Sequence, residues 1–203
     1  MTRGYPGANR ECSVESEVVM TVQINLPASG VRSQADFDNL PEVSPGWAWE
    51  LRSGRLELTL MPVTYWHFRI VMLVLEHWLR LGHEVAGEQY VADSGFARGE
   101  TGRNNFVADG VVFESGYRPA KNSTTHDAAH IHTVIEAVSA GSEDRDAVDK
   151  VRVYAALGIP NYWIIRGDAD SDDIDGFITM YQLVDGEYQV VGNRLVSQLS
   201  VTD

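Results

Sequence analysis

The chain has 203 residues and a formal net charge of −13, with 44% hydrophobic and 22% charged residues. This length and composition predict one globular domain with a substantial core. Its acidity argues against broad, nonspecific nucleic-acid binding, although a local basic groove stays compatible with it. A single cysteine, Cys12, excludes an internal disulfide and suits the cytoplasm. We expect neither a secretory signal nor a membrane span, because no apolar run is long enough.

The first half of the chain predicts an arm, a hairpin and a helix. Residues 1–40 are polar and are expected to form an N-terminal arm, with one short strand over 18–26, before a domain over 41–203. Alternating segments at 47–52 and 55–60 flank Ser53 and Gly54, which predicts a β-hairpin. A helix is predicted from Thr64 to residue 81, ended by Gly82. Its helical spacing predicts a core-facing stripe of Phe68, Val71, Met72, Leu75 and Leu79.

The second half predicts four strands, a helix and a second hairpin. The strands are expected over 84–91, 105–113, 131–138 and 162–165, with Tyr162 and Trp163 in the core, and a polar, irregular insertion over 115–129. Ser142 can cap a helix that Gly158 and Pro160 end. A hairpin over 178–191 turns at residues 185 and 186. This order predicts an α+β fold with an α/β-like core, in which a mixed sheet is flanked by helices.

Two acidic residues interrupt apolar, β-branched runs that are typical of buried strands. Asp109 lies within 106–113, and Glu136 lies within 133–138. A buried carboxylate is costly unless a cation, a metal or hydrogen bonds compensate it. If the two strands are neighbours, the acids can converge, and hard divalent cations prefer such oxygen ligands. Strand alternation would group Asp109 with Val107 and Val111 on one face.

The helix after Glu136 carries Asp146, Lys150 and Tyr154 at intervals of four residues, and therefore on one stripe. A lysine near two acids can supply a compact positive charge to an attacking water or a developing anion. From spacing alone, purely structural roles for these residues are favoured over a catalytic site. They consist of a strand-end turn at Asp109, a salt-bridged Glu136 and a solvent-facing Asp146–Lys150 pair contributing about 0.3–0.5 kcal/mol.

Residues 46–191 resemble the Uma-two family of restriction-endonuclease-like proteins. The resemblance is carried by W-E-L-R-S-G-R-L at 49–56, the helix with His67, V-A-D at 107–109 and V-I-E-A-V-S at 134–139. Its most specific part is the D-x3-K-x3-Y-A-x2-G-x-P-x-Y-W-I pattern over 146–164. The chain departs from the family pattern at Ala108, at residues 131 and 132, at Ala140 and in the 115–129 insertion.

The resemblance implies a PD-(D/E)xK nuclease fold whose motif acids correspond to Asp109 and Glu136. The usual lysine position, two residues after the glutamate, is Val138 here. Family members resembling this chain place the lysine on the following helix, at the position of Lys150. The implied activity is Mg²⁺- or Mn²⁺-dependent hydrolysis of DNA, with Asp109, Glu136 and the Ala137 carbonyl as metal ligands and with Asp109, Glu136 and Lys150 as catalytic residues.

Supporting roles are implied for Asp146, Tyr154, Glu50 and His67. Glu50 is equally consistent with a metal role and with a half-exposed hairpin acid, and His67 with a site role and with simple packing. Two other functions stay open. One is a non-catalytic interaction module that keeps the nuclease fold. The other is a hydrolase of a small phosphorylated metabolite, which suits an acidic surface better than long DNA. A homodimer is expected by analogy.

Three further segments carry weaker signals. The histidines at 126, 130 and 132 lack a fourth ligand at zinc spacing, so an exposed loop is the favoured interpretation. The acidic run over 168–173 departs from a calcium loop at its glycine and glutamate positions. The glycine-rich loop over 95–102 lacks a phosphate-loop ending, but Arg98 and Arg103 could contact phosphates of a substrate.

Overall fold

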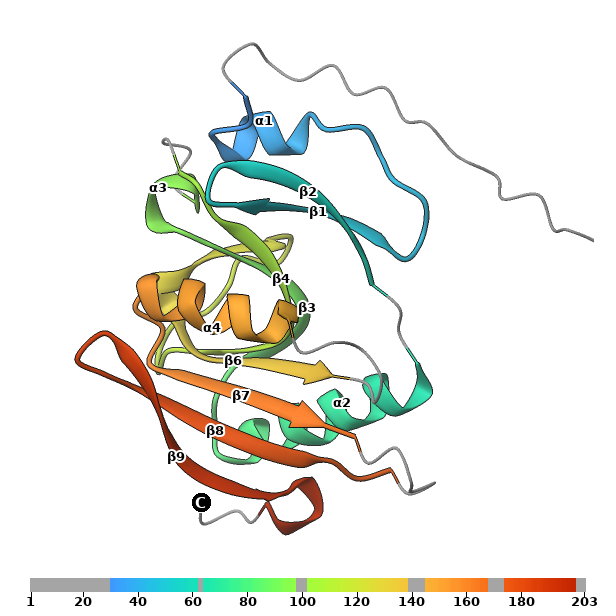
Figure 1. Cartoon of the computed structure of the whole chain (residues 1–203), viewed down its shortest axis with the longest axis vertical. Coiled ribbons are helices and arrows are strands. Elements are labelled where there is room, and N and C mark those ends of the chain that lie inside the picture. Colours follow the sequence, from blue (N-terminus) through green and yellow to red (C-terminus); the bar gives the residue numbers. More distant parts are fainter. Residues whose placement is uncertain (1–29, 62–63, 98–101, 139–144, 168–173, 200–203) are drawn as a thin grey trace, which may run out of the picture.

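A computed structural model describes residues 30–61, 64–97, 102–138, 145–167 and 174–199 (Figure 1). Within them, nine strands form one mixed sheet. The predicted strand over 18–26, the acidic run over 168–173, Ser142 and Arg98 lie outside the described residues. No described helix is long and apolar enough to cross a membrane.

The strands follow the order β2-β1-β4-β6-β7-β8-β9, while β3 pairs with β4 and β5 pairs with β3. Only the β6–β7 and β3–β5 pairs are parallel. The strands are β1 (Trp47–Arg52), β2 (Arg55–Leu60), β3 (Val85–Ala92), β4 (Asn105–Phe113), β5 (Thr125–Asp127), β6 (Ile131–Val138), β7 (Asn161–Arg166), β8 (Phe177–Val184) and β9 (Glu187–Leu195).

Two helices cover opposite faces of the sheet, with α4 in front of it and α2 behind it in Figure 1. On one face, α2 (Tyr65–Arg80) packs against Ile135 and Ile165. On the other face, Tyr154 of α4 (Arg145–Ala156) packs against Val134 and Ile164. Two short helices, α1 (Gln34–Asp38) and α3 (Ser94–Ala97), and two 3₁₀ turns, Ala128–His130 and Val196–Gln198, complete the described elements. The predicted α+β fold with flanking helices and terminal hairpins is confirmed.

The core-facing stripe of α2 differs from the predicted one. Val71 and Leu75 are buried as expected, but Phe68 and Leu79 are 52% and 53% exposed. The helix is apolar on two neighbouring stripes, so its periodicity does not decide which one faces the sheet. The stripe that packs there consists of Ile70, Val71, Val74, Leu75 and Trp78.

Two segments predicted to be irregular contribute packed elements. The insertion over 115–129 contains β5, which runs parallel to β3 and buries His126. In the segment predicted as an arm, Val31 and Phe37 are buried against Trp49 of the hairpin. Apolar side chains inside polar segments therefore dock onto the sheet, which polarity averaged over a window does not reveal.

Candidate active site

The two predicted acids lie on neighbouring antiparallel strands. In the β4–β6 ladder Gly110 pairs with Ile135, and continuing this register by one pair places Asp109 across from Glu136. The Asp109 carboxylate accepts a hydrogen bond of 2.7 Å from the Ala137 N–H. The expected convergence of the two strands is therefore correct, although the observed contact of Ala137 is through its N–H.

The backbone around Asp109 departs from regular strand alternation. Ala108 and Val111 both pack in the cluster on the α4 side, so the alternation is interrupted between them. Across the ladder, Glu88 has a φ of 50°, in the left-handed region that non-glycine residues rarely adopt. The predicted grouping of Asp109 with Val111 is wrong. The Asp109 carboxylate instead reaches α2, where its Oδ2 lies 3.0 Å from His67 Nε2.

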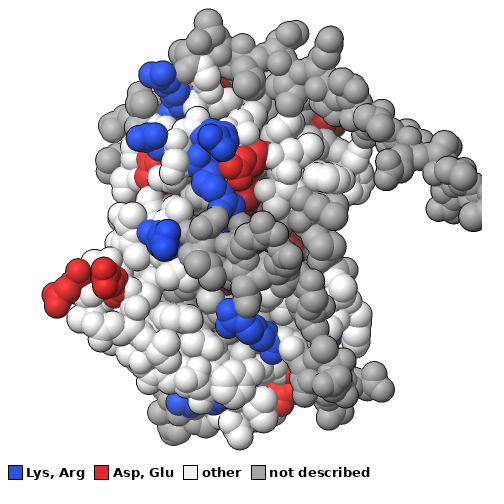
Figure 2. All heavy atoms as spheres, in the orientation of Figure 1, with Lys and Arg blue, Asp and Glu red and all other residues white. Residues whose placement is uncertain are grey.

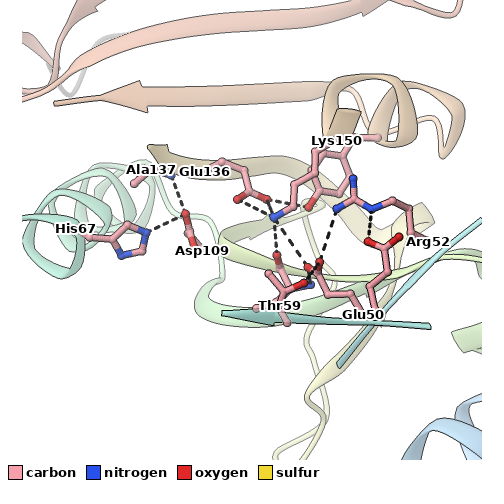
Figure 3. A network of polar contacts seen from close by, with 11 residues as sticks. Glu50, Arg52, Thr59, His67, Asp109, Glu136, Ala137 and Lys150 are labelled. Atoms are coloured by element: carbon pink, nitrogen blue, oxygen red, sulfur yellow. Dashed lines mark hydrogen bonds and ion pairs between the residues drawn. The ribbon is translucent and has the colours of Figure 1, made fainter. Parts of the chain in front are cut away.

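Lys150 is a buried cation at the centre of the site (Figure 3). Its Nζ lies 3.2 Å from each carboxylate oxygen of Glu136 and 4.0 Å from Glu50 Oε1. It also donates to the Val107 carbonyl at 3.2 Å. The side chain is 6% exposed, so the solvent-facing alternative for Lys150 is wrong. The side chain of Asp146 lies outside the described part of the chain.

Glu136 is enclosed by polar partners from α4. The Tyr154 hydroxyl donates to its Oε1 at 2.9 Å, and Lys150 contacts both of its oxygens. Burial raises the pKa of Glu136 to about 8, while the Lys150 ammonium opposes this rise and the negative charge of Asp109 adds to it. Burial also raises the pKa of Tyr154 well above its usual value, so this hydroxyl stays a donor.

Glu50 is fully buried, so its interpretation as a half-exposed hairpin acid is wrong. It accepts hydrogen bonds of 3.0 Å from the Val107 N–H and from the Thr59 hydroxyl. Its carboxylate also lies 3.8 Å from the Arg52 guanidinium and 4.0 Å from Lys150. One buried acid therefore connects the hairpin, β4 and α4.

The contacts of Val107 explain why these side chains meet at this position. On one edge, β4 pairs with β1 at a single position, Leu51 with Asn105, and with β6 only from Gly110 onward. Between these two points, Glu50 accepts from the Val107 N–H and Lys150 donates to the Val107 carbonyl. Backbone groups that are buried need such partners. The junction between two strand neighbours thus holds the charged residues of the site.

His67 borders a hollow of about 240 Å³ that also reaches Asp109. Its hydrogen bond to Asp109 raises the pKa of His67, against the opposing effect of burial. Phe68 and Glu88 line the same hollow. His67 therefore lies at the site, and Phe68 faces this hollow, which explains its exposure.

Sequence reasoning missed Thr59 and Arg52. In the hairpin register Glu50 lies opposite Glu57, so Thr59 is its diagonal neighbour on the same face. Arg52 lies two residues after Glu50 and forms a 3.1 Å ion pair with Glu57. Both residues could have been found by applying the hairpin register to Glu50 once its burial was assumed.

The histidines at 126, 130 and 132 do not form a metal cluster. His126 is buried and hydrogen-bonds Gln89, which makes the expectation of an exposed loop wrong for this residue. His130 stacks on Tyr117, and His132 contacts Thr133. Among the described residues, no group of three or more His, Cys, Asp or Glu side chains could hold a metal ion. A metal-ligand role for Asp109 and Glu136 stays a prediction from the sequence.

The Uma2 (Uma-two) family, described as "Putative restriction endonuclease", matches residues 34–203. The chain belongs to this family. A crystal structure of "a putative nuclease belonging to DUF820" from Anabaena variabilis is similar to this Uma2 chain, with a TM-score of 0.55 and 16% sequence identity. The match covers 80% of this chain and 83% of that one, which confirms the predicted nuclease-like fold. No curated protein matches this chain.

Proposed function

We propose that this protein is a metal-dependent nuclease that hydrolyses phosphodiester bonds of DNA. The observation that carries the proposal is the buried Lys150 ammonium, which lies between Glu136 and Glu50. Asp109 lies on β4, the strand next to that of Glu136. The described restriction endonuclease family and the nuclease-like fold support the reaction class.

The charges at this junction are poorly explained by folding alone. A buried ion pair adds little net stability, because desolvation offsets most of the Coulomb attraction. Here two carboxylates share Lys150, and burial raises the pKa of Glu136 to about 8. Strongly shifted, buried groups of this kind are characteristic of functional sites. A positive charge added beside Asp109 and Glu136 would favour the ionised form of Glu136, against the effect of burial.

Asp109 and Glu136 fit a hard divalent cation. Mg²⁺ is held in many proteins by one or two carboxylates and keeps several water ligands, so a two-carboxylate set is sufficient. We expect Asp109, Glu136 and the Ala137 carbonyl to hold Mg²⁺ or Mn²⁺. When bound, such an ion would supply a Lewis acid for the phosphodiester and lower the pKa of a coordinated water.

The remaining residues would orient these groups. The Lys150 ammonium would stabilise negative charge on the phosphate, held in place by the Val107 carbonyl and Glu50. Tyr154 would orient Glu136, and His67 would orient Asp109. Support from Asp146 stays a prediction from the sequence.

Cleavage assays with several substrates test the proposal. The purified protein would be incubated with supercoiled, linear duplex and single-stranded DNA in Mg²⁺, in Mn²⁺ or in EDTA. We expect cleavage only with a divalent ion, and we expect Asp109→Ala and Lys150→Ala to abolish it. Cleavage that survives both substitutions would contradict the proposal.

The net charge of −13 favours one second candidate, the hydrolysis of a small phosphorylated metabolite. A small diester such as bis(p-nitrophenyl) phosphate serves as the probe in the same assay. Metal-dependent hydrolysis of this diester with no cleavage of any DNA form would favour the second candidate. Metal binding without hydrolysis of either substrate would favour a non-catalytic nuclease-fold module.

A further inference from the structure

A hollow of about 340 Å³ lies at the turn of the β1–β2 hairpin, apart from the residues of the candidate active site. Two arginines, Arg32 and Arg103, line it together with Ser53, Gly54 and Gly102. We call it the arginine hollow. The described residues that line it include no acidic side chain.

The arginine hollow carries basic side chains in an acidic chain, and its nearest carboxylates, Asp36 and Asp93, accept hydrogen bonds from the backbone N–H groups of Arg32 and Arg103. The sequence has 29 acidic and 16 basic residues, yet this hollow presents two arginines. Arg55, which follows Gly54 and is the first residue of β2, is exposed. Figure 2 shows several Lys and Arg side chains at this end of the molecule, with Asp and Glu side chains beside them. A local concentration of arginines in an acidic protein is suited to a phosphate-bearing ligand.

Backbone contacts hold Arg103 in place. Its guanidinium donates to the Ser53 carbonyl at 2.9 Å, and its N–H donates to Asp93 Oδ2 at 2.7 Å. The Gly54 N–H donates in turn to the Arg103 carbonyl at 2.7 Å. The Gly102 N–H donates to the Arg32 carbonyl at 2.8 Å, which joins the two arginine segments. A guanidinium positioned in this way loses little conformational freedom when it binds a ligand.

The arginine hollow is connected to the candidate active site by two strands. Ser53 directly follows β1 and lies three residues after Glu50, and Arg103 lies two residues before β4 begins and four residues before Val107. At about 3.3 Å per residue, these separations are about 10 and 13 Å. One strand of duplex DNA carries a phosphate about every 3.4 Å along the helix axis. The separation therefore corresponds to about three to four phosphates.

We propose that the arginine hollow binds backbone phosphates of a nucleic-acid strand, about three to four nucleotides from the bond held at Lys150. The position of the scissile bond rests on the proposed function, whereas strand binding at the hollow does not. A strand of several nucleotides can contact both places at once. A small phosphorylated metabolite cannot, so the hollow favours DNA over the metabolite as the substrate.

Binding measurements without cleavage test this inference. Fluorescein-labelled single-stranded and duplex oligonucleotides would be titrated with the protein in EDTA at several salt concentrations. We expect Arg32→Gln combined with Arg103→Gln to weaken binding at least several-fold. The slope of log K against log salt should fall by about 0.9 for each lost duplex contact and about 0.7 for each single-strand contact.

Matched controls come from two exposed arginines outside the hollow. Arg80 pairs with Glu76 and Arg118 with Glu84, and both side chains are mostly exposed. The double variant Arg80→Gln with Arg118→Gln removes the same charge, and it should leave the affinity and the salt slope nearly unchanged. Equal losses in the two double variants, or an unchanged slope in the hollow variant, would overturn the inference.

Substrate length separates this inference from the proposed function. With Mg²⁺ present, the hollow variant should lose kcat/KM on long oligonucleotides and keep it on a dinucleotide, which is too short to reach the hollow. Cleavage of long DNA that is unaffected by the hollow variant overturns the inference alone. Binding that depends on the hollow, in a protein that cleaves nothing, overturns the nuclease proposal alone.

Discussion

The two ends of β6 hold titratable side chains in different surroundings, with His132 half-buried and Glu136 buried. At one end, the centroid of the His132 ring lies 5.3 Å from that of Trp78 and 5.2 Å from that of His83. His132 also forms a hydrogen bond with the adjacent Thr133. At the other end, Glu136 contacts the Lys150 ammonium at 3.2 Å. Burial lowers the pKa of His132 and raises that of Glu136, so in both cases it favours the neutral form.

The difference lies in the partners. At His132, burial and the neighbouring His83 favour the neutral imidazole, while the negative charge of Glu114 opposes this effect. Glu136 faces a second buried charge, Lys150, and that charge is also close to Glu50. Burial alone therefore does not identify a functional residue. Burial combined with an opposite charge from a distant element, at a junction between strands, does so much better.

The largest expected effect follows from removing the buried cation. Lys150→Met keeps most of the side-chain volume but removes the charge, so we expect kcat for DNA cleavage to fall by about 10²–10³ or more. Lys121, the chain's other lysine, is exposed, so Lys121→Met should retain full activity. Steady-state cleavage rates of both variants, with circular dichroism as a check of folding, make the measurement. Equal cleavage rates for Lys150→Met and Lys121→Met would contradict a functional role for the buried charge of Lys150.

A smaller effect is expected from the acid that holds Lys150. Glu50→Gln preserves the shape and one acceptor but removes the charge near the ammonium, and we expect kcat to fall about 10- to 100-fold. The affinity for DNA should change little, because Glu50 is fully buried. Glu57→Gln, which alters the partly exposed partner of Arg52, is the matched control. A change in KM with kcat unchanged would argue against the positioning role of Glu50.

The pH dependence of metal binding sharpens the comparison at Glu136. Because its pKa is raised to about 8, the carboxyl is protonated below that pH and must release a proton to bind a cation. Mg²⁺ affinity should therefore rise by up to about tenfold per pH unit until about pH 8, and then level off. Calorimetry in buffers of different ionisation enthalpy measures the released proton. Glu136→Gln should release none.

The same pKa predicts how pH acts on the metal-free fold. Between the unfolded value of about 4.3 and the folded value of about 8, the folded chain binds more protons than the unfolded chain. The contribution of Glu136 to stability is therefore present below that range and is lost as pH rises through it. Thermal unfolding in EDTA should show that the melting temperature of the natural chain falls as pH rises across this range. The fall should be smaller in Glu136→Gln. A parallel decline in both proteins would contradict the prediction.

The smallest effect is expected at the other end of β6. His132→Gln retains hydrogen-bonding groups but removes an aromatic ring packed on Trp78, so we expect a loss of about 1–2 kcal/mol in the free energy of unfolding. Cleavage by the folded protein should stay within about twofold, since His132 does not contact the site. A large loss of kcat in His132→Gln, with the free energy of unfolding unchanged, would contradict a purely structural role for His132.

Local patterns predicted most of the elements of the fold. The bounds of β4 and β6 agree with the predicted ranges 105–113 and 131–138, because continuous apolar, β-branched runs report a strand buried on both faces. The same patterns failed for α2, where Phe68 and Met72 form a second apolar stripe beside the buried one. They also failed for His126, whose burial depends on the docking of a three-residue strand.

The sequence by itself determined the candidate charges: Asp109 and Glu136 within apolar strands, and Lys150 within a family-specific helix pattern. Only the tertiary structure decided that Lys150 contacts Glu136 and Glu50, that Glu50 is buried, and that Arg32 lies beside Arg103. The physical reason is the range of each interaction. Periodicity reports contacts within a few residues, whereas Glu50 and Lys150 reach Val107 across 57 and 43 residues. Such contacts depend on where the strands of the sheet separate, and no local pattern records that position.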